Sequence, residues 1–196
     1  MKVAIFHNYM DNIGGAELVS LILARELGAT IYTTNVDQEK IDKMGFTGVC
    51  PISIGTVPTN APFRQQKALR LFRRLELGKT YDFYVIAGDW AMSGAVNHKP
   101  NLWYVHSPTR ELWDSYKYVR EQMITWWQRP IFDIWVMYNR FLKRRYVNHV
   151  EQFACNSKNT SKRLRKFLRK NGTVIYPPVD TAQYSSLFPI KIFGCQ

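Results

Sequence analysis

Short apolar runs alternate along the chain with segments whose apolar residues recur at helical spacing. Residues 2–7 are β-branched and aromatic, which predicts a buried strand, and a loop ending in Gly14 and Gly15 follows. In residues 16–27 apolar side chains then recur three and four positions apart, with an acidic residue near the start and a basic one near the end, as the helix dipole favours. The chain therefore opens with a strand, a glycine turn and a helix.

The same order of strand, short polar segment and helix repeats toward the C-terminus. Further strands are predicted at residues 30–34, 52–54, 81–87, 102–105, 152–155 and 173–176. Helical patterns lie between them, at residues 37–44, 62–77, from 111 onward, 130–147 and 157–171. Right-handed crossovers between such units make a doubly wound, Rossmann-like α/β parallel sheet with all strand ends at one edge. Residues 1–180 are expected to form this domain, and 181–196 an irregular tail or the start of a hinge.

The segment of residues 123–147 has two interpretations. It holds Trp126 and Trp127, a break before Pro130, and then a helix that is apolar around most of its circumference and closes with the basic run 143–145. Such a helix either packs in the core or in an interface, or lies on a membrane with its aromatic residues in lipid and its arginines at anionic headgroups. Core packing is the commoner arrangement for aromatic stripes, so the pattern favours it.

Composition restricts the partners and the compartment. The chain has 196 residues and a formal charge of +12, which points to an anionic partner: nucleic acid, a phosphorylated small molecule or an acidic membrane. Its three cysteines and four histidines have no paired or metal-ligand spacing, so neither disulfides nor a metal site is expected. We see no secretory signal and no apolar run that could cross a bilayer, which favours the cytoplasm.

Candidate chemistry lies just beyond the predicted strands. Gly14 and Gly15 would expose backbone N–H groups at a helix start, where anions bind. Asp89 and His106 follow two later strands, where open parallel sheets bind ligands, although a lone histidine is more often structural. The GxSxG motif, a Walker loop and the three-glycine dinucleotide fingerprint are all missing from the sequence, which disfavours the enzymes that use them.

Four segments together resemble the N-terminal domain of family 4 retaining glycosyltransferases, especially the mannosyltransferase-like branch. They are HNYMDNIGGAE at 7–17, YVHSPTRELWD at 104–114, FACNSKNTSKRLRKF at 153–167 and VIYPPVD at 174–180. The resemblance implies one half of a two-domain GT-B enzyme, in which the N-terminal domain binds the acceptor. The C-terminal domain of that family binds the nucleotide sugar.

The resemblance also implies roles for individual residues. Gly14 and Gly15 would approach the phosphates and sugar of the donor. His106 would lie beside the transferred sugar, orienting it or stabilising the positive charge that develops at its anomeric carbon. Three further residues would line the acceptor pocket: Asp11, Asp89 and Arg110.

The reaction implied is transfer of a hexose with retained configuration to a glycan or lipid-phosphate acceptor, in polysaccharide biosynthesis. The donor would be GDP-mannose or a UDP-sugar, with no metal or other cofactor. Because the sequence stops after the PPVD segment, the donor-binding domain is expected on a separate chain, and this chain is expected to be inactive alone. Peripheral contact with the inner face of the membrane is also expected.

Two other functions remain open. The chain could be a non-catalytic module that binds an acceptor or a membrane and recruits a partner through its basic and aromatic surface. Nucleic-acid binding is disfavoured because the sequence contains no recognisable motif for it, and an anionic lipid-phosphate acceptor explains the charge equally well.

Overall fold

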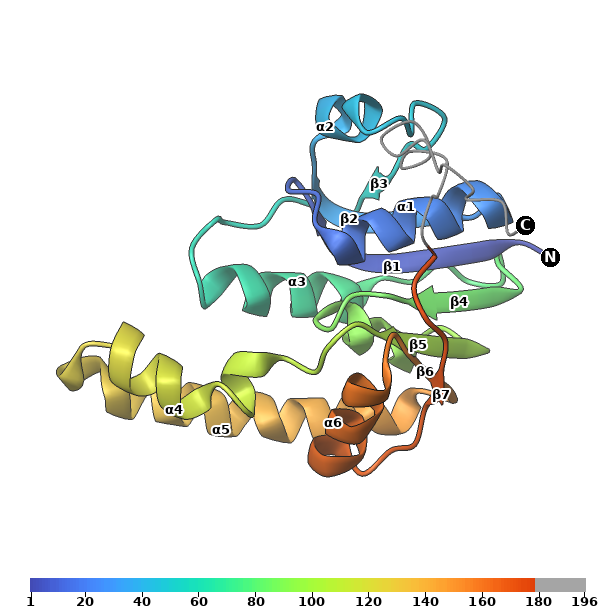
Figure 1. Ribbon diagram of the computed structural model, residues 1–196. Coiled ribbons are helices and arrows are strands. Elements are labelled where there is room, and N and C mark those ends of the chain that lie inside the picture. Colours follow the sequence, from blue (N-terminus) through green and yellow to red (C-terminus); the bar gives the residue numbers. More distant parts are fainter. Residues whose placement is uncertain (179–196) are drawn as a thin grey trace, which may run out of the picture.

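A single seven-stranded sheet organises the computed structural model, which describes residues 1–178. Its strand order is β3-β2-β1-β4-β5-β6-β7, and every pair of neighbours is parallel (Figure 1). The predicted fold class, a doubly wound Rossmann-like α/β domain, is confirmed. The predicted tail of residues 181–196 lies outside the described residues.

The elements follow one another in the predicted order. The strands are β1 (Val3–Met10), β2 (Thr30–Val36), β3 (Ile52–Ser53), β4 (Phe83–Ile86), β5 (Asn101–Val105), β6 (Gln152–Cys155) and β7 (Thr173–Val174). The α-helices are α1 (Gly15–Leu27), α2 (Gln38–Lys43), α3 (Phe63–Arg74), α4 (Tyr116–Tyr118), α5 (Arg129–Tyr146) and α6 (Lys158–Leu168). Short 3₁₀ or π turns are η1 (Ala91–Val96), η2 (Arg110–Leu112), η3 (Val119–Met123), η4 (Trp126–Gln128) and η5 (Val147–His149).

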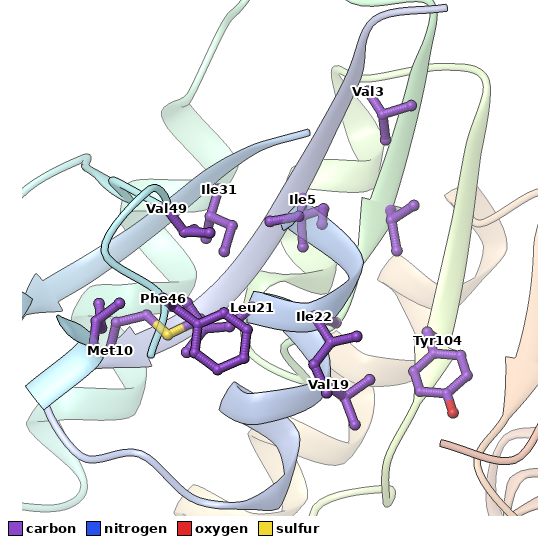
Figure 2. Packing of buried hydrophobic residues seen from close by; sticks show 14 of the residues in the cluster. Val3, Ile5, Met10, Val19, Leu21, Ile22, Ile31, Phe46, Val49 and Tyr104 are labelled. Atoms are coloured by element: carbon purple, nitrogen blue, oxygen red, sulfur yellow. The ribbon is translucent and has the colours of Figure 1, made fainter. Parts of the chain in front are cut away.

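Two hydrophobic layers cover the two faces of the sheet, because successive side chains of a strand point to opposite faces. Ile5 of β1 packs in one layer against Leu21 and Ile22 of α1, as Figure 2 shows. Its neighbour Phe6 belongs to the other layer, with Phe72 of α3. That second layer also takes in η1, α6 and the ends of β5 and β6.

The chain reverses its direction of travel across the sheet between β1 and β4. After β1 it proceeds to β2 and β3 on one side, and then returns past β1 to pair β4 against its other side. This reversal is the topological switch point, where open α/β sheets bind ligands at the carboxyl ends of the strands.

Asn8 and Gly88 join the two strands at this point. The Asn8 side-chain Oδ1 accepts hydrogen bonds from the backbone N–H groups of Trp90 and Ala91, both at 2.9 Å. A Cβ atom added to Gly88 would lie 2.3 Å from Asn8 Oδ1, so only glycine permits this close approach.

Two parts of the chain differ from the sequence prediction. Helical structure after residue 111 is broken into the short elements η2, α4 and η3 rather than one helix. α6 ends at Leu168, with Arg169 in the left-handed conformation, instead of continuing to residue 171. The predicted N-cap of α6 is confirmed, because the Ser157 hydroxyl accepts a hydrogen bond from the Thr160 N–H at 3.2 Å.

The favoured core packing of α5 holds for only one of its faces. Val136 and Leu142 are buried in a third hydrophobic cluster, together with Trp90 and Leu112. Phe141 on the outer face is 60% exposed, so that side of the helix is not packed in the core, and its packing in an interface stays a prediction. No helix within residues 1–178 combines the length and the apolar character needed to cross a membrane.

Candidate functional site

The glycine turn between β1 and α1 is held by Glu17. Its carboxylate accepts a hydrogen bond from the Gly14 N–H at 3.0 Å and lies 3.0 Å from Nε2 of His7. Burial opposes the charged carboxylate, but the hydrogen bond and charge of His7 together hold its pKa below the usual range. The N–H of Gly14 is therefore already hydrogen-bonded within the protein and is not free to bind a ligand.

Gly15 is the open residue of the turn. A Cβ atom built there would meet nothing within 4 Å, and its N–H belongs to the first turn of α1, where no helical carbonyl accepts. The predicted role of close approach to an anion thus fits Gly15 better than Gly14.

His106 follows β5 and is largely enclosed. Its ring packs edge-on against Tyr104, and its Nε2 is buried with no hydrogen-bond partner. Burial lowers the pKa of His106 to about 4, with the positive charge of His7 acting in the same direction and Glu17 opposing. The imidazole is therefore neutral near pH 7, and it is within electrostatic reach of the pair that holds the glycine turn.

Arg163 of α6 fixes the loop that carries His106, a role that sequence reasoning missed. Its guanidinium donates hydrogen bonds to the Ser107 hydroxyl at 2.6 Å, to the carbonyl of Pro108 at 3.1 Å and to the Asp114 carboxylate at 2.8 Å. Arg163 lies in segment 153–167, which resembles the glycosyltransferase family, but 56 residues separate it from Ser107. In the sequence it is one of several basic residues of this helix, and nothing distinguishes it from the others.

Asp89, the residue predicted at the end of β4, is paired with a buried lysine. Lys143 of α5 lies 2.9 Å from the carboxylate, with side-chain exposures of 3% and 15% for lysine and aspartate. The same ammonium donates to the Asp89 carbonyl and lies 4.1 Å from the centre of the Trp90 ring. Burial lowers the pKa of Lys143, and the negative charge of Asp89 opposes that shift.

Asp11 forms a second ion pair at the end of β1. Both carboxylate oxygens accept from Nη2 of Arg64 in α3, at 2.5 and 2.7 Å. The Arg64 guanidinium in turn lies 4.0 Å from the ring centre of Tyr9. Asp11 and Asp89 thus reach the carboxyl edge as predicted, each already neutralised by a cation.

Arg110 and its neighbour Glu111 face different surroundings. The Arg110 side chain is 69% exposed and lies 3.8 Å from Asp114. Glu111 turns inward, where burial raises its pKa and the charge of Asp89 acts in the same direction. A carboxyl group with a raised pKa at a sheet switch point marks a candidate functional residue. The family resemblance pointed to Arg110, and the inward orientation of Glu111 in the short η2 turn could not be read from the sequence pattern.

Unpaired polar atoms gather around this edge of the sheet. Buried side-chain atoms that lack a hydrogen-bond partner within the described chain include Tyr9 Oη, His106 Nε2, Thr109 Oγ1 and Trp135 Nε1. Tyr9, Trp90 and Trp135 also belong to one hydrophobic cluster. Since buried polar atoms are normally paired with protein groups or water, these atoms are candidates for contacts with water or a ligand.

These groups offer acid–base and hydrogen-bonding chemistry rather than a metal centre. Within residues 1–178, no three histidine, cysteine, aspartate or glutamate side chains come together as metal ligands would. The prediction that the reaction needs no metal stays a prediction.

The sheet and its switch point define an α/β ligand-binding domain, and comparison with known proteins gives its family. The chain belongs to glycosyltransferase family 4, whose model matches residues 13–183. None of the curated proteins matches the sequence.

Solved structures of another protein share the fold. HepE of Anabaena, in complex with UDP and glucose, superposes with a TM-score of 0.60 at 14% identity, covering 94% of this chain and 46% of that one. Its complex with UDP-glucose gives a TM-score of 0.58 at 15% identity, with 95% and 48% covered. The chain therefore corresponds to about half the length of these GT-B structures.

Proposed function

We propose that this chain supplies the acceptor-side half of a hexosyltransferase site. The observation that carries the proposal is the group of orphaned polar atoms and aromatic rings at the switch point of a family 4 domain. The acceptor is a glycan or a lipid-phosphate, the donor is a nucleotide sugar, and the anomeric configuration is retained without a metal.

The donor side of the site is supplied by a second Rossmann-like domain. The chain spans about half of the HepE structure, and HepE binds UDP-glucose. Both a UDP-hexose and GDP-mannose are candidates, because the base and the sugar are read by the donor-binding domain in this scheme. The open N–H at Gly15 faces the donor phosphates.

His106 acts on the transferred sugar as a neutral group. With its pKa near 4, the imidazole carries no charge that would repel the positive anomeric carbon. Its unpaired Nε2 can hydrogen-bond a sugar hydroxyl. The departing phosphate accepts the acceptor proton, so this chain needs no general base.

Reconstitution tests the proposal. The purified chain is incubated with radiolabelled GDP-mannose or UDP-glucose and a lipid-phosphate acceptor, alone and together with the donor-binding domain of a family 4 enzyme. We expect transfer only with both polypeptides and one of the two donors. Robust transfer by the chain alone would overturn the half-site scheme, and no transfer by the pair with any nucleotide sugar would overturn the proposed reaction.

A further inference from the structure

One face of α5 is apolar yet exposed. Five residues at helical spacing form it, with exposed fractions of 67% for Ile131, 62% for Ile134, 67% for Met137, 54% for Tyr138 and 60% for Phe141. The exposed face of an ordinary surface helix is polar, so this side of α5 lacks the partner that its composition requires.

Residues before the helix extend this face. Trp126 and Trp127 of η4 are 75% and 58% exposed, and Met123 at the end of η3 is 68% exposed. We call these eight side chains the apolar ridge: Met123, Trp126, Trp127, Ile131, Ile134, Met137, Tyr138 and Phe141. In Figure 1 the part of the chain that carries the ridge, around α4 and α5, projects at the lower left beyond the carboxyl edge of the sheet.

Basic residues border the ridge. Residues 117–145 contain seven lysines and arginines against two acidic residues, and of the seven only Lys143 is buried, on the opposite side of α5. Of the two acidic residues, Asp133 is neutralised by Arg120 at 2.9 Å. A groove of about 350 Å³ beside Met137 and Phe141 is lined in part by Arg140 and Arg144. Positive charge thus lies where the headgroups of an embedded helix would lie.

We propose that the apolar ridge docks on an anionic lipid bilayer. Trp and Tyr with flanking arginines are typical of a membrane interface, and anionic headgroups match the basic border. A second copy of this chain would instead bring its own basic border against the first, and like charges repel. The surface of an anionic membrane is therefore the partner that fits both the apolar ridge and its basic border.

The opposite face of α5 connects the ridge to the candidate site. At about 100° per residue, Ile134 and Lys143 lie on opposite sides of the helix. Lys143 contacts Asp89 at the switch point, so a membrane against the ridge lies about one helix diameter, roughly 10 Å, from that carboxylate. Docking would bring a lipid-linked acceptor to the site from the bilayer. This last step rests on the proposed function, whereas docking itself does not.

Vesicle flotation of the purified chain tests the docking. We expect strong binding to phosphatidylcholine vesicles with 30% phosphatidylglycerol, weak binding to pure phosphatidylcholine, and loss of binding at high salt. The combined Trp126→Ser, Trp127→Ser and Phe141→Ser variant should lower the partition coefficient at least tenfold. Its matched control, Leu27→Ser with Ile52→Ser, changes apolar residues that are 49% and 46% exposed elsewhere and should bind normally.

Charge is tested separately. Arg144→Glu with Arg145→Glu should also lower binding to anionic vesicles at least tenfold, whereas Arg70→Glu with Arg74→Glu on α3 should lower it much less. Since all these side chains are exposed, the melting temperatures should match the wild type. Brominated lipids should quench wild-type tryptophan emission, a readout that needs no variant to fold.

Three results would overturn the docking. They are unchanged flotation of the ridge variant, equal binding to both vesicle types, and a ridge-dependent dimer in solution that does not float with vesicles. Because no donor, acceptor or second polypeptide is present, failure here leaves the transferase proposal standing, and the reconstitution with a soluble acceptor can fail independently.

Discussion

The half-buried imidazole of His106 combines two properties that rarely occur together in a structural histidine. It has no partner for Nε2, and its pKa is lowered to about 4 by burial and by the charge of His7. A histidine kept only for packing would hydrogen-bond both ring nitrogens, as His98 does with the Leu77 N–H and the Gly94 carbonyl. The unpaired nitrogen therefore favours a ligand-directed role.

Replacing His106 should impair catalysis far more than folding. In the reconstituted pair, His106→Gln should lower kcat about 100-fold, the usual cost of removing one preorganised polar contact to the reacting sugar. His149→Gln, which changes a histidine at the opposite end of the domain, is the matched control. Steady-state rates and melting temperatures measure the two effects, and an unimpaired His106→Gln enzyme would refute the assigned role.

The same residue makes a prediction about pH. A histidine whose folded pKa lies below its unfolded value of about 6.5 favours the folded state above pH 6.5, and loses that contribution as the pH falls toward 4. Between pH 7 and pH 4.5, the wild type should lose about 2 kcal/mol of unfolding free energy more than His106→Gln. Urea titrations at both pH values measure this, and parallel losses would contradict the neutral imidazole.

Two glycines at the strand ends are expected to have different roles, Gly88 in stability and Gly15 in donor binding. Gly88→Ala should cost about 2 to 4 kcal/mol of stability, because its Cβ would overlap Asn8. Gly15→Ala should instead raise stability by about 0.5 to 1 kcal/mol, since the site is open and alanine favours helix. Transfer by the Gly15→Ala enzyme should nevertheless fall. Chemical denaturation and kinetics of both variants test this, and a fully active Gly15→Ala enzyme would remove the glycine from the donor site.

At the scale of elements, a buried ion pair joins α5 to the end of β4, in addition to the hydrophobic contacts of Val136 and Leu142. Lys143→Met should cost about 3 to 5 kcal/mol, because it leaves the Asp89 carboxylate buried without its cation. Adding Asp89→Asn should recover much of that loss, since the double variant buries no charge. Denaturant titration of the two single variants and the double variant gives the coupling; purely additive losses would show that the pair does not act as a unit.

Strands and helices could be predicted because the apolar side chains that each element buries recur at the spacing of that element. The alternation in β1 and the spacing in α1 follow from which side chains face the two hydrophobic layers. The ion pairs could not be predicted. Asp11 and Arg64 are 53 residues apart, and nothing local in either segment marks its partner. The cover of the outer face of α5 could not be predicted for a related reason: an apolar pattern shows that a face avoids water, but not whether the core, another protein surface or lipid covers it.

At the scale of the whole molecule, the candidate site and the apolar ridge share one end of the domain. The strand ends carry Gly15, His106 and Glu111, and the chain segment with the ridge projects beyond that same edge in Figure 1. In the proposed enzyme the donor domain faces the strand ends, and the bilayer faces the outer side of α5. The two surfaces do not compete, so a membrane-bound chain can still receive a donor.

Membrane docking should therefore change the rate on lipid-linked acceptors only. With the reconstituted pair and anionic vesicles, Trp126→Ser with Trp127→Ser should lower transfer to a lipid-linked acceptor at least tenfold, because the chain no longer concentrates at the surface that holds its substrate. Transfer to a soluble analogue should be unchanged, since neither tryptophan lies among the residues of the candidate site. Equal losses on both acceptors would place these side chains in the site itself, and no loss on either would separate the ridge from catalysis.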